Sequence, residues 1–123
     1  MDFEILFYKD SSGNNPIEEF FLELVKSNRV LLVKAQSGIE KLRNRAYHRE
    51  PLSKHIELGL WELRVIAGSN ILRILYTFEK GRIIILLHVF IKKQQKTPEG
   101  ELEIARKRLK DIKQRKVYEK KKR

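Results

Sequence analysis

Five charged or ionisable side chains alternate with apolar residues in three segments of the chain. They are Glu62 and Arg64 in the segment 60–67, Arg73 in 71–79, and His88 and Lys92 in 82–92. If these segments are β-strands, residues two apart point to the same side, and one face of a sheet can gather all five. Arginine binds phosphate through two parallel hydrogen bonds and stays charged at any physiological pH. The pattern therefore favours a site that handles phosphate groups.

The charge of the whole chain also points to an anionic partner. It has 27 lysines and arginines against 16 acidic residues, a net charge of +11 and a pI near 10.0. Such a charge attracts nucleic acid, an acidic protein or an anionic membrane. The alternative is a solvated sheet face with scattered cations, as in most basic domains. Arg64 and Arg73 weaken that alternative, because an arginine inside an apolar strand must find a partner or face solvent.

Several classes of protein are excluded by composition. The absence of cysteine excludes a disulfide framework, a cysteine-ligated metal site and a thiol nucleophile. No histidine pair has metal-ligand spacing beside a carboxylate, so we expect no metal and no other cofactor. The longest apolar run, 83–87, is far too short to cross a membrane. The segment 1–4 carries acids where a secretory signal has a basic head, so we expect a cytoplasmic protein without a membrane partner.

The three apolar segments predict an antiparallel meander, because short turn sequences join them. These turns are Gly68-Ser69-Asn70 and Glu79-Lys80-Gly81. The last segment is almost continuously apolar, as in a strand covered on both faces. One more strand is predicted near the N-terminus, where Phe3, Ile5 and Phe7 recur at every second position. The polar stretch before the meander, which contains His48 and His55, is predicted as a loop.

Three helices complete the predicted fold. Asn15-Pro16 begins the first, Ser27-Asn28 separates it from the second, and Thr97-Pro98-Glu99 caps the third. Each helix has one apolar stripe, and the first two form an αα-hairpin. The basic end, 115–123, is predicted to fray. The whole is a single α+β domain over residues 1–123, β-α-α-β-β-β-α, with an antiparallel meander sheet packed against helices and a basic C-terminal helix and tail.

Three motifs, in this order, resemble a known toxin family. They are Leu60-Trp61-Glu62-Leu63-Arg64, Arg73-Ile74-Leu75-Tyr76 and Leu87-His88-Val89-Phe90-Ile91-Lys92-Lys93-Gln94-Gln95-Lys96-Thr97-Pro98. Together they resemble the HigB-like toxins of phage-derived type, in the RelE/ParE superfamily, and the resemblance covers nearly the whole chain. It implies a RelE-like fold and a type II toxin that cleaves mRNA, usually on the ribosome. It also implies a HigA-like helix-turn-helix antitoxin, through which alone the toxin would meet operator DNA.

Metal-free RNA cleavage suggests roles for individual residues beside this resemblance. The RNA 2′-hydroxyl attacks the adjacent phosphate, so the protein must align the attack, stabilise charge and move protons. Arg64 and Arg73 suit phosphate binding and transition-state stabilisation. The remaining candidates are Lys92 and Lys93 for charge stabilisation or leaving-group protonation, Glu62 or His88 as the proton acceptor, and Lys96, Lys54, His55 and Arg49 for contacts with RNA.

Some of these residues also have a structural interpretation. RelE toxins often carry a tyrosine in the C-terminal segment, but this chain has none between Tyr76 and Tyr118, so the proton acceptor stays open. His88, between apolar neighbours, is typical of a hydrogen-bonded core histidine. His55 is typical of a solvated loop. Trp61 shares the parity of Leu63 and Val65, which favours core packing over stacking on a base.

Two other functions fit the same fold. One is a ParE-like gyrase inhibitor that cleaves nothing, and the other is a basic RNA-binding module without catalysis. The antitoxin also has two alternatives. It can cover the groove around Arg64, Arg73 and Lys93, or it can clamp the helical hairpin, whose outer surface carries cations at positions 26, 34, 41, 43 and 45.

Overall fold

The computed structural model describes residues 2–92 and 97–122, and the side chains of 2–92 and 97–115. Lys93 and Lys96 lie outside the described residues. The elements are β1 (Glu4–Phe7), α1 (Pro16–Ser27), α2 (Arg29–Lys41), a short 3-10 helix (Arg45–Tyr47), β2 (Ser53–Glu57), β3 (Leu60–Ala67), β4 (Asn70–Glu79), β5 (Ile83–Lys92) and α3 (Glu99–Lys122). The fold is α+β, as predicted.

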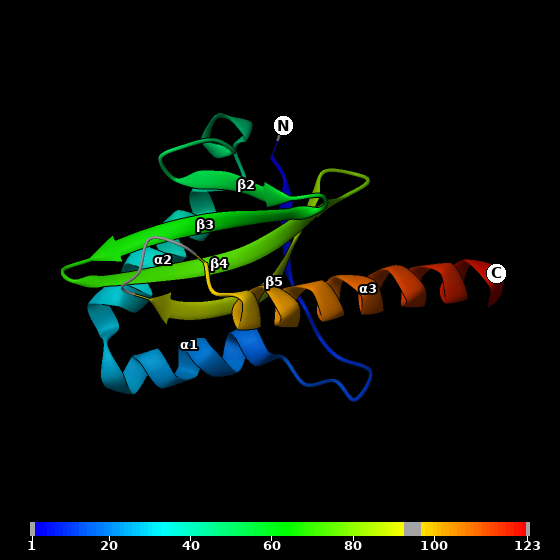
Figure 1. Cartoon of the computed structure of the whole chain (residues 1–123), viewed down its shortest axis with the longest axis horizontal. Coiled ribbons are helices and arrows are strands. Elements are labelled where there is room, and N and C mark those ends of the chain that lie inside the picture. The colour runs from blue at the N-terminus through cyan, green and yellow to red at the C-terminus, as the bar shows by residue number, and fades with distance from the viewer. Residues whose placement is uncertain (1, 93–96, 123) are drawn as a thin grey trace.

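The five described strands form one sheet in the order β1-β5-β4-β3-β2 (Figure 1). The pairs β3–β4 and β4–β5 are antiparallel, which confirms the predicted meander. β1 lies parallel to β5 at one edge. A parallel neighbour needs a long connection, and the α1–α2 hairpin lies between β1 and the meander in the chain.

The strand β2 was not predicted, so the predicted element order lacks one strand. β2 pairs with β3 through Ser53 opposite Leu63 and Lys54 opposite Glu62. Its sequence, SKHIE, shows no clear alternation of apolar and polar residues. Ser53 is completely buried, and its hydroxyl shares a hydrogen bond with the Tyr76 hydroxyl of β4. The prediction of a loop around His55 is therefore wrong.

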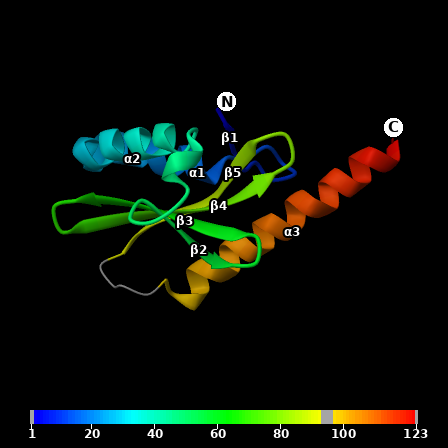
Figure 2. The same ribbon diagram turned by 90° about the horizontal axis from the view of Figure 1, so that it is seen from above.

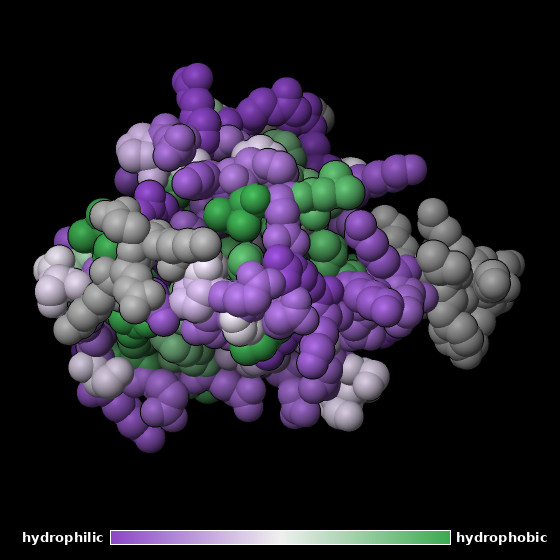
Figure 3. All heavy atoms as spheres, viewed as in Figure 1, coloured by the Kyte–Doolittle hydropathy of each residue, from purple (hydrophilic) through white to green (hydrophobic). Residues whose placement is uncertain are grey.

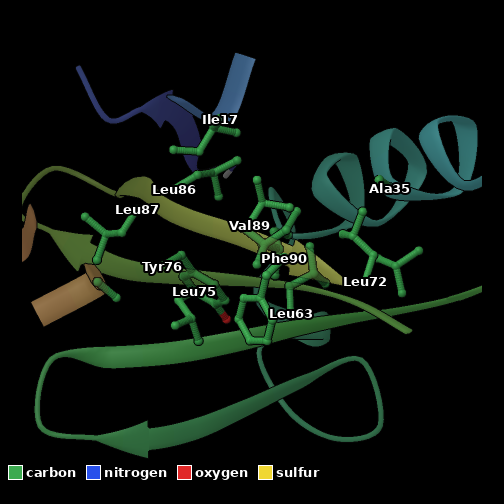
Figure 4. Close-up of a cluster of buried hydrophobic side chains, with 14 of the residues drawn as sticks. Ile17, Ala35, Leu63, Leu72, Leu75, Tyr76, Leu86, Leu87, Val89 and Phe90 are labelled. Carbon is green, nitrogen blue, oxygen red and sulfur yellow. The ribbon is translucent and has the colours of Figure 1, made fainter. Parts of the chain in front are cut away.

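Helices cover both faces of the sheet. Figure 2 shows α1 and α2 on one side and α3 on the other. Both α1 and α3 contact β5, which confirms the prediction that this strand is covered on two faces. Figure 4 shows part of the core, where Ile17 of α1 and Ala35 of α2 face the sheet. Because α3 occupies the second face, polar residues there are partly enclosed.

The hairpin begins and turns where its capping residues predict. The Asn15 side chain accepts a hydrogen bond from the Glu18 backbone N–H at 3.0 Å, and Pro16 occupies the first turn. Asn28 ends α1 and caps α2 by accepting from the Leu31 N–H at 3.1 Å. These caps fix where the two helices meet, so their apolar stripes face the same side of the sheet.

The last helix is longer than predicted, because it continues to Lys122. Its basic end was predicted to fray, but lysine, arginine and glutamate have high helix propensity. Within the described part of the chain, no helix has the length and apolar character needed to cross a membrane.

Candidate functional site

The candidate site is a pocket of about 440 Å³ at the start of α3. Its described lining residues are Lys54, His55 and Ile56 of β2, Glu62 and Arg64 of β3, Thr97, and Leu102 of α3. Figure 3 shows the face of the molecule that α3 crosses, on which hydrophilic side chains predominate. Four of the predicted site residues, Lys54, His55, Glu62 and Arg64, are thus brought together.

Glu62 is the buried centre of the site. Its side chain is only 3% exposed. Its Oε1 lies 3.7 Å from Arg64 Nε, and its Oε2 lies 3.6 Å from Arg73 Nη1. The Thr97 hydroxyl donates a hydrogen bond to Oε2 at 2.5 Å. A buried charge is tolerated only when it is paired and hydrogen-bonded, and these contacts from β3, β4 and the start of α3 meet that need.

The two arginines of the site have different environments. Arg64 and Arg73 are directly opposed across β3 and β4, an arrangement of like charges that is unfavourable without a counter-ion. Glu62 supplies that counter-ion. The Arg64 side chain is 26% exposed and lines the pocket, whereas the Arg73 side chain is fully buried. Arg73 Nη1 also donates to the Thr97 hydroxyl at 3.3 Å, so Arg73 connects the sheet to the start of α3.

His88 belongs to a separate cluster beneath α3. The ladder pairs Leu75 with His88 and Tyr76 with Leu86, so Leu87 forms a β-bulge. Arg108 Nη1 donates to the Leu87 carbonyl at 2.8 Å, which gives this bulge residue a hydrogen-bond partner. His88 Nε2 lies 2.8 Å from Glu101 Oε1. His88 is not among the described residues that line the pocket.

The contacts of His88 define its protonation. Burial lowers the pKa of its imidazole, against the opposing effect of the Glu101 carboxylate. A neutral ring therefore donates from Nε2 to Glu101 and leaves Nδ1 as an acceptor, 3.4 Å from Arg108 Nη1. Since both ring nitrogens have partners, His88 fits the structural interpretation better than the role of proton acceptor.

The other predicted site residues are spread around the pocket. Lys92 is half-buried at the end of β5, opposite Ile71, and Arg49 is exposed in the turn before β2. Neither is among the described residues that line the pocket. His55 packs edge-on against Trp61 with ring centroids 4.9 Å apart. Trp61 in turn packs on Phe78 at 5.3 Å, which confirms its predicted core packing.

His48 packs against the core instead of lying in a solvated loop. Its ring contacts Phe3 and Phe78, with centroid distances of 4.7 and 5.0 Å. Its Nε2 lies 2.6 Å from the Leu42 carbonyl oxygen. The His48 side chain therefore connects the end of α2 with Phe3 and with Phe78 of β4.

Sequence reasoning missed Thr97 as a site residue, because Thr97-Pro98 was interpreted as a helix cap and as the end of the third motif, without a role in the site. It also missed the ion pair that fixes α3 beside the pocket. Arg106 binds the two carboxylate oxygens of Glu57 from Nε and Nη2, at 2.9 and 2.7 Å. These hydrogen bonds lower the pKa of the Glu57 carboxyl. Arg106 also pairs with Glu99 and Glu103, so one side chain fastens the first turns of α3 to β2.

One comparison with known proteins assigns the chain to a family. The model of the family described as phage derived protein Gp49-like (DUF891) matches residues 19–110. That range contains the described pocket residues and most of the structured chain. The search of curated proteins gave no match.

Proposed function

The chain belongs to the Gp49-like family of phage-derived proteins, which are toxins of the RelE/HigB type, and we propose that it is a HigB-like mRNA endoribonuclease. One observation carries this proposal. A partly exposed arginine, Arg64, lies in the pocket beside the buried carboxylate of Glu62. A cation can bind the phosphate and a carboxylate can accept the 2′-hydroxyl proton, which are two of the tasks in attack by a 2′-hydroxyl.

In the proposed reaction, the RNA 2′-oxygen attacks the adjacent phosphorus and the bond to the 5′-oxygen breaks. Glu62 accepts the 2′-hydroxyl proton, and the departing 5′-oxygen takes a proton from Lys92 or Lys93. Arg64 binds the phosphate and stabilises the charge of the phosphorane. Lys54, His55, Arg49 and Lys96 contact neighbouring parts of the RNA, and no metal or other cofactor takes part.

Arg73 has a different role in this proposal from the one predicted by sequence. Direct phosphate binding by Arg73 stays a prediction. The Arg73 side chain is fully buried against Glu62 and Thr97, and it is not among the described residues that line the pocket with Arg64. We therefore assign Arg73 as a positioning residue that holds the Glu62 carboxylate and the start of α3.

The chemistry of the cut ends tests the proposal. Internal attack leaves a 2′,3′-cyclic phosphate or a 3′-phosphate on the upstream RNA fragment. We expect such ends when the chain is expressed under control and mRNA ends and DNA breaks are mapped together. A 3′-hydroxyl upstream with a 5′-phosphate downstream would show attack by water and contradict the mechanism. DNA breaks without mRNA cuts would support the ParE-like gyrase inhibitor, and unharmed cells with intact RNA would support a plain RNA-binding module.

The family also implies an antitoxin partner, which we propose to be HigA-like and to bind the α1–α2 hairpin. The hairpin has an apolar groove of about 380 Å³ that includes Leu22 and Val25. Leu22, Val30 and Val33 are each at least 60% exposed, and exposed apolar patches mark interfaces. Exposed Lys26 and Arg29 flank the junction of the two helices. An amphipathic helix with acidic flanks complements this surface.

Substitution of the hairpin surface should separate neutralisation from toxicity. We expect Leu22→Asp with Val33→Asp to weaken the binding of a co-expressed neutralising antitoxin by about 30-fold or more, since truncating a central contact commonly costs about 2 kcal/mol. RNA cleavage by the free toxin should be unchanged. Leu58→Asp is the matched control, because Leu58 is 94% exposed in the β2–β3 turn. Unchanged antitoxin binding in the double variant would indicate instead that the antitoxin covers the groove around Arg64.

A further inference from the structure

A second pocket adjoins the candidate site on the other side of Arg64. It has a volume of about 290 Å³ and lies between α2 and the edge of β3. Its described lining residues are Lys34, Ser37, Gly38 and Lys41 of α2, Leu52, and Arg64, Val65 and Ile66 of β3. We call it the α2-edge pocket. Arg64 also lines the first pocket, so the two pockets meet at this residue.

The α2-edge pocket exists because β2 is shorter than β3. Pairing between the two strands begins with Ser53 opposite Leu63, and the Leu52 carbonyl accepts from the Arg64 N–H at 2.9 Å. Beyond Arg64, β3 continues to Ala67 and has no described residue of β2 opposite it. The edge of β3 is therefore uncovered from Val65 onwards, and α2 passes over it.

A close approach of helix and strand brings lysines to this edge. A Cβ atom on Gly38 would lie 3.2 Å from Val65 Cγ2, so the absence of a side chain at position 38 lets α2 pack tightly on β3. Lys34 and Lys41, seven residues apart, share a face of α2. Both are exposed, and both line the pocket with Arg64.

The electrostatics of the α2-edge pocket fit an anion. None of its described lining residues is acidic. Among the described residues, neither Lys34 nor Lys41 takes part in an ion pair, and Lys41 lies 5.8 Å from the centre of the Tyr47 ring. The Ser37 hydroxyl adds a hydrogen-bond donor. Two exposed lysines and a hydroxyl around one hollow are groups that bind phosphate.

We propose that the α2-edge pocket binds a backbone phosphate of the same RNA strand that is cut in the first pocket. This inference rests on the proposed endoribonuclease function and adds a second contact for its substrate. Since Arg64 lines both pockets, the ligand that joins them must carry repeated negative charges along one chain. A single-stranded RNA backbone does so independently of sequence. The α2-edge pocket thus positions the strand, and the first pocket carries the chemistry.

The salt dependence of RNA binding tests this inference. The probe is a short single-stranded 2′-O-methyl RNA, which cannot be cut by 2′-hydroxyl attack, and binding is measured by fluorescence anisotropy. Each phosphate contact to a single strand adds about 0.7 to the slope of log K against log salt. We expect Lys34→Gln with Lys41→Gln to reduce that slope by about 0.7, the contribution of one phosphate. Between 50 and 200 mM salt, the variant should therefore lose about 2.6-fold less affinity than the unmodified chain.

The control pair is Lys80→Gln with Lys113→Gln, which removes the same charge from exposed positions at the β4–β5 turn and on α3. An equal reduction of the slope in both pairs, or no reduction in the Lys34/Lys41 pair, overturns the inference. An unchanged slope with weaker antitoxin binding would assign the pocket to an acidic protein and also overturn it. If the unmodified chain neither binds nor cuts RNA, the proposed function fails as well. RNA cutting with an unchanged slope rejects the α2-edge pocket alone.

Discussion

Replacing Arg64 by alanine should lower the rate of RNA cleavage by about 10²–10³-fold, the usual effect of losing one charge stabiliser at the transition state. Growth arrest should be lost with it. Of the two arginines beside Glu62, Arg64 is the partly exposed one, and it lines the pocket. It is therefore the arginine that can contact phosphate without a change in the packing of the sheet.

The fold of Arg64→Ala should be preserved. Glu62 keeps its contacts with Arg73 and Thr97 when Arg64 is removed, so the buried carboxylate retains a cation and a hydrogen bond. Lys113→Ala is the control for the loss of one positive charge, since Lys113 is exposed on α3. Arg64→Lys should fall between the two, because lysine keeps the charge but loses the planar fork. A normally folded Arg64→Ala chain that remains fully toxic would reject the assignment of Arg64 to phosphate.

Strand periodicity was sufficient to predict most of the fold. The meander, the α1–α2 hairpin and its caps follow from local patterns of apolar, turn and capping residues. The strand β2 could not be predicted in this way. Its buried Ser53 is held by a hydrogen bond to Tyr76, and its Lys54 lies opposite Glu62. Tyr76 is 23 residues away from Ser53, so no local pattern reports this contact.

Strand parity also predicted that Glu62, Arg64, Arg73 and His88 share one face of the sheet, but it did not predict which element covers that face. The register puts Arg64 opposite Arg73 and His88 opposite Leu75 on that face, as parity requires. α3 then crosses the same face and divides it. Glu62 and Arg64 line an open pocket, whereas His88 packs beneath α3 against Glu101. Parity gives the side of a sheet on which a residue lies, and tertiary packing decides its exposure.

Arg73→Met should destabilise the fold strongly, in contrast to Arg64→Ala. The Arg73 side chain is fully buried, and its Nη1 lies 3.6 Å from Glu62 Oε2. Removing one partner of a buried ion pair leaves an uncompensated charge and costs about 3–5 kcal/mol. For a domain of this size we expect the melting temperature to fall by about 10–20 °C, as measured by circular dichroism.

A second substitution should rescue stability without rescuing activity. In Arg73→Met with Glu62→Gln, the neutral amide removes the buried charge and still offers an oxygen to the Thr97 hydroxyl. We therefore expect most of the lost melting temperature to return, because replacing both members of a buried ion pair is often neutral or stabilising. RNA cleavage should stay abolished, since the proposed proton acceptor is gone. The opposite result, an Arg73→Met chain that melts normally yet cuts no RNA, would contradict the positioning role. It would instead support direct binding of the scissile phosphate by Arg73, because only a contact made with the substrate could then account for the loss.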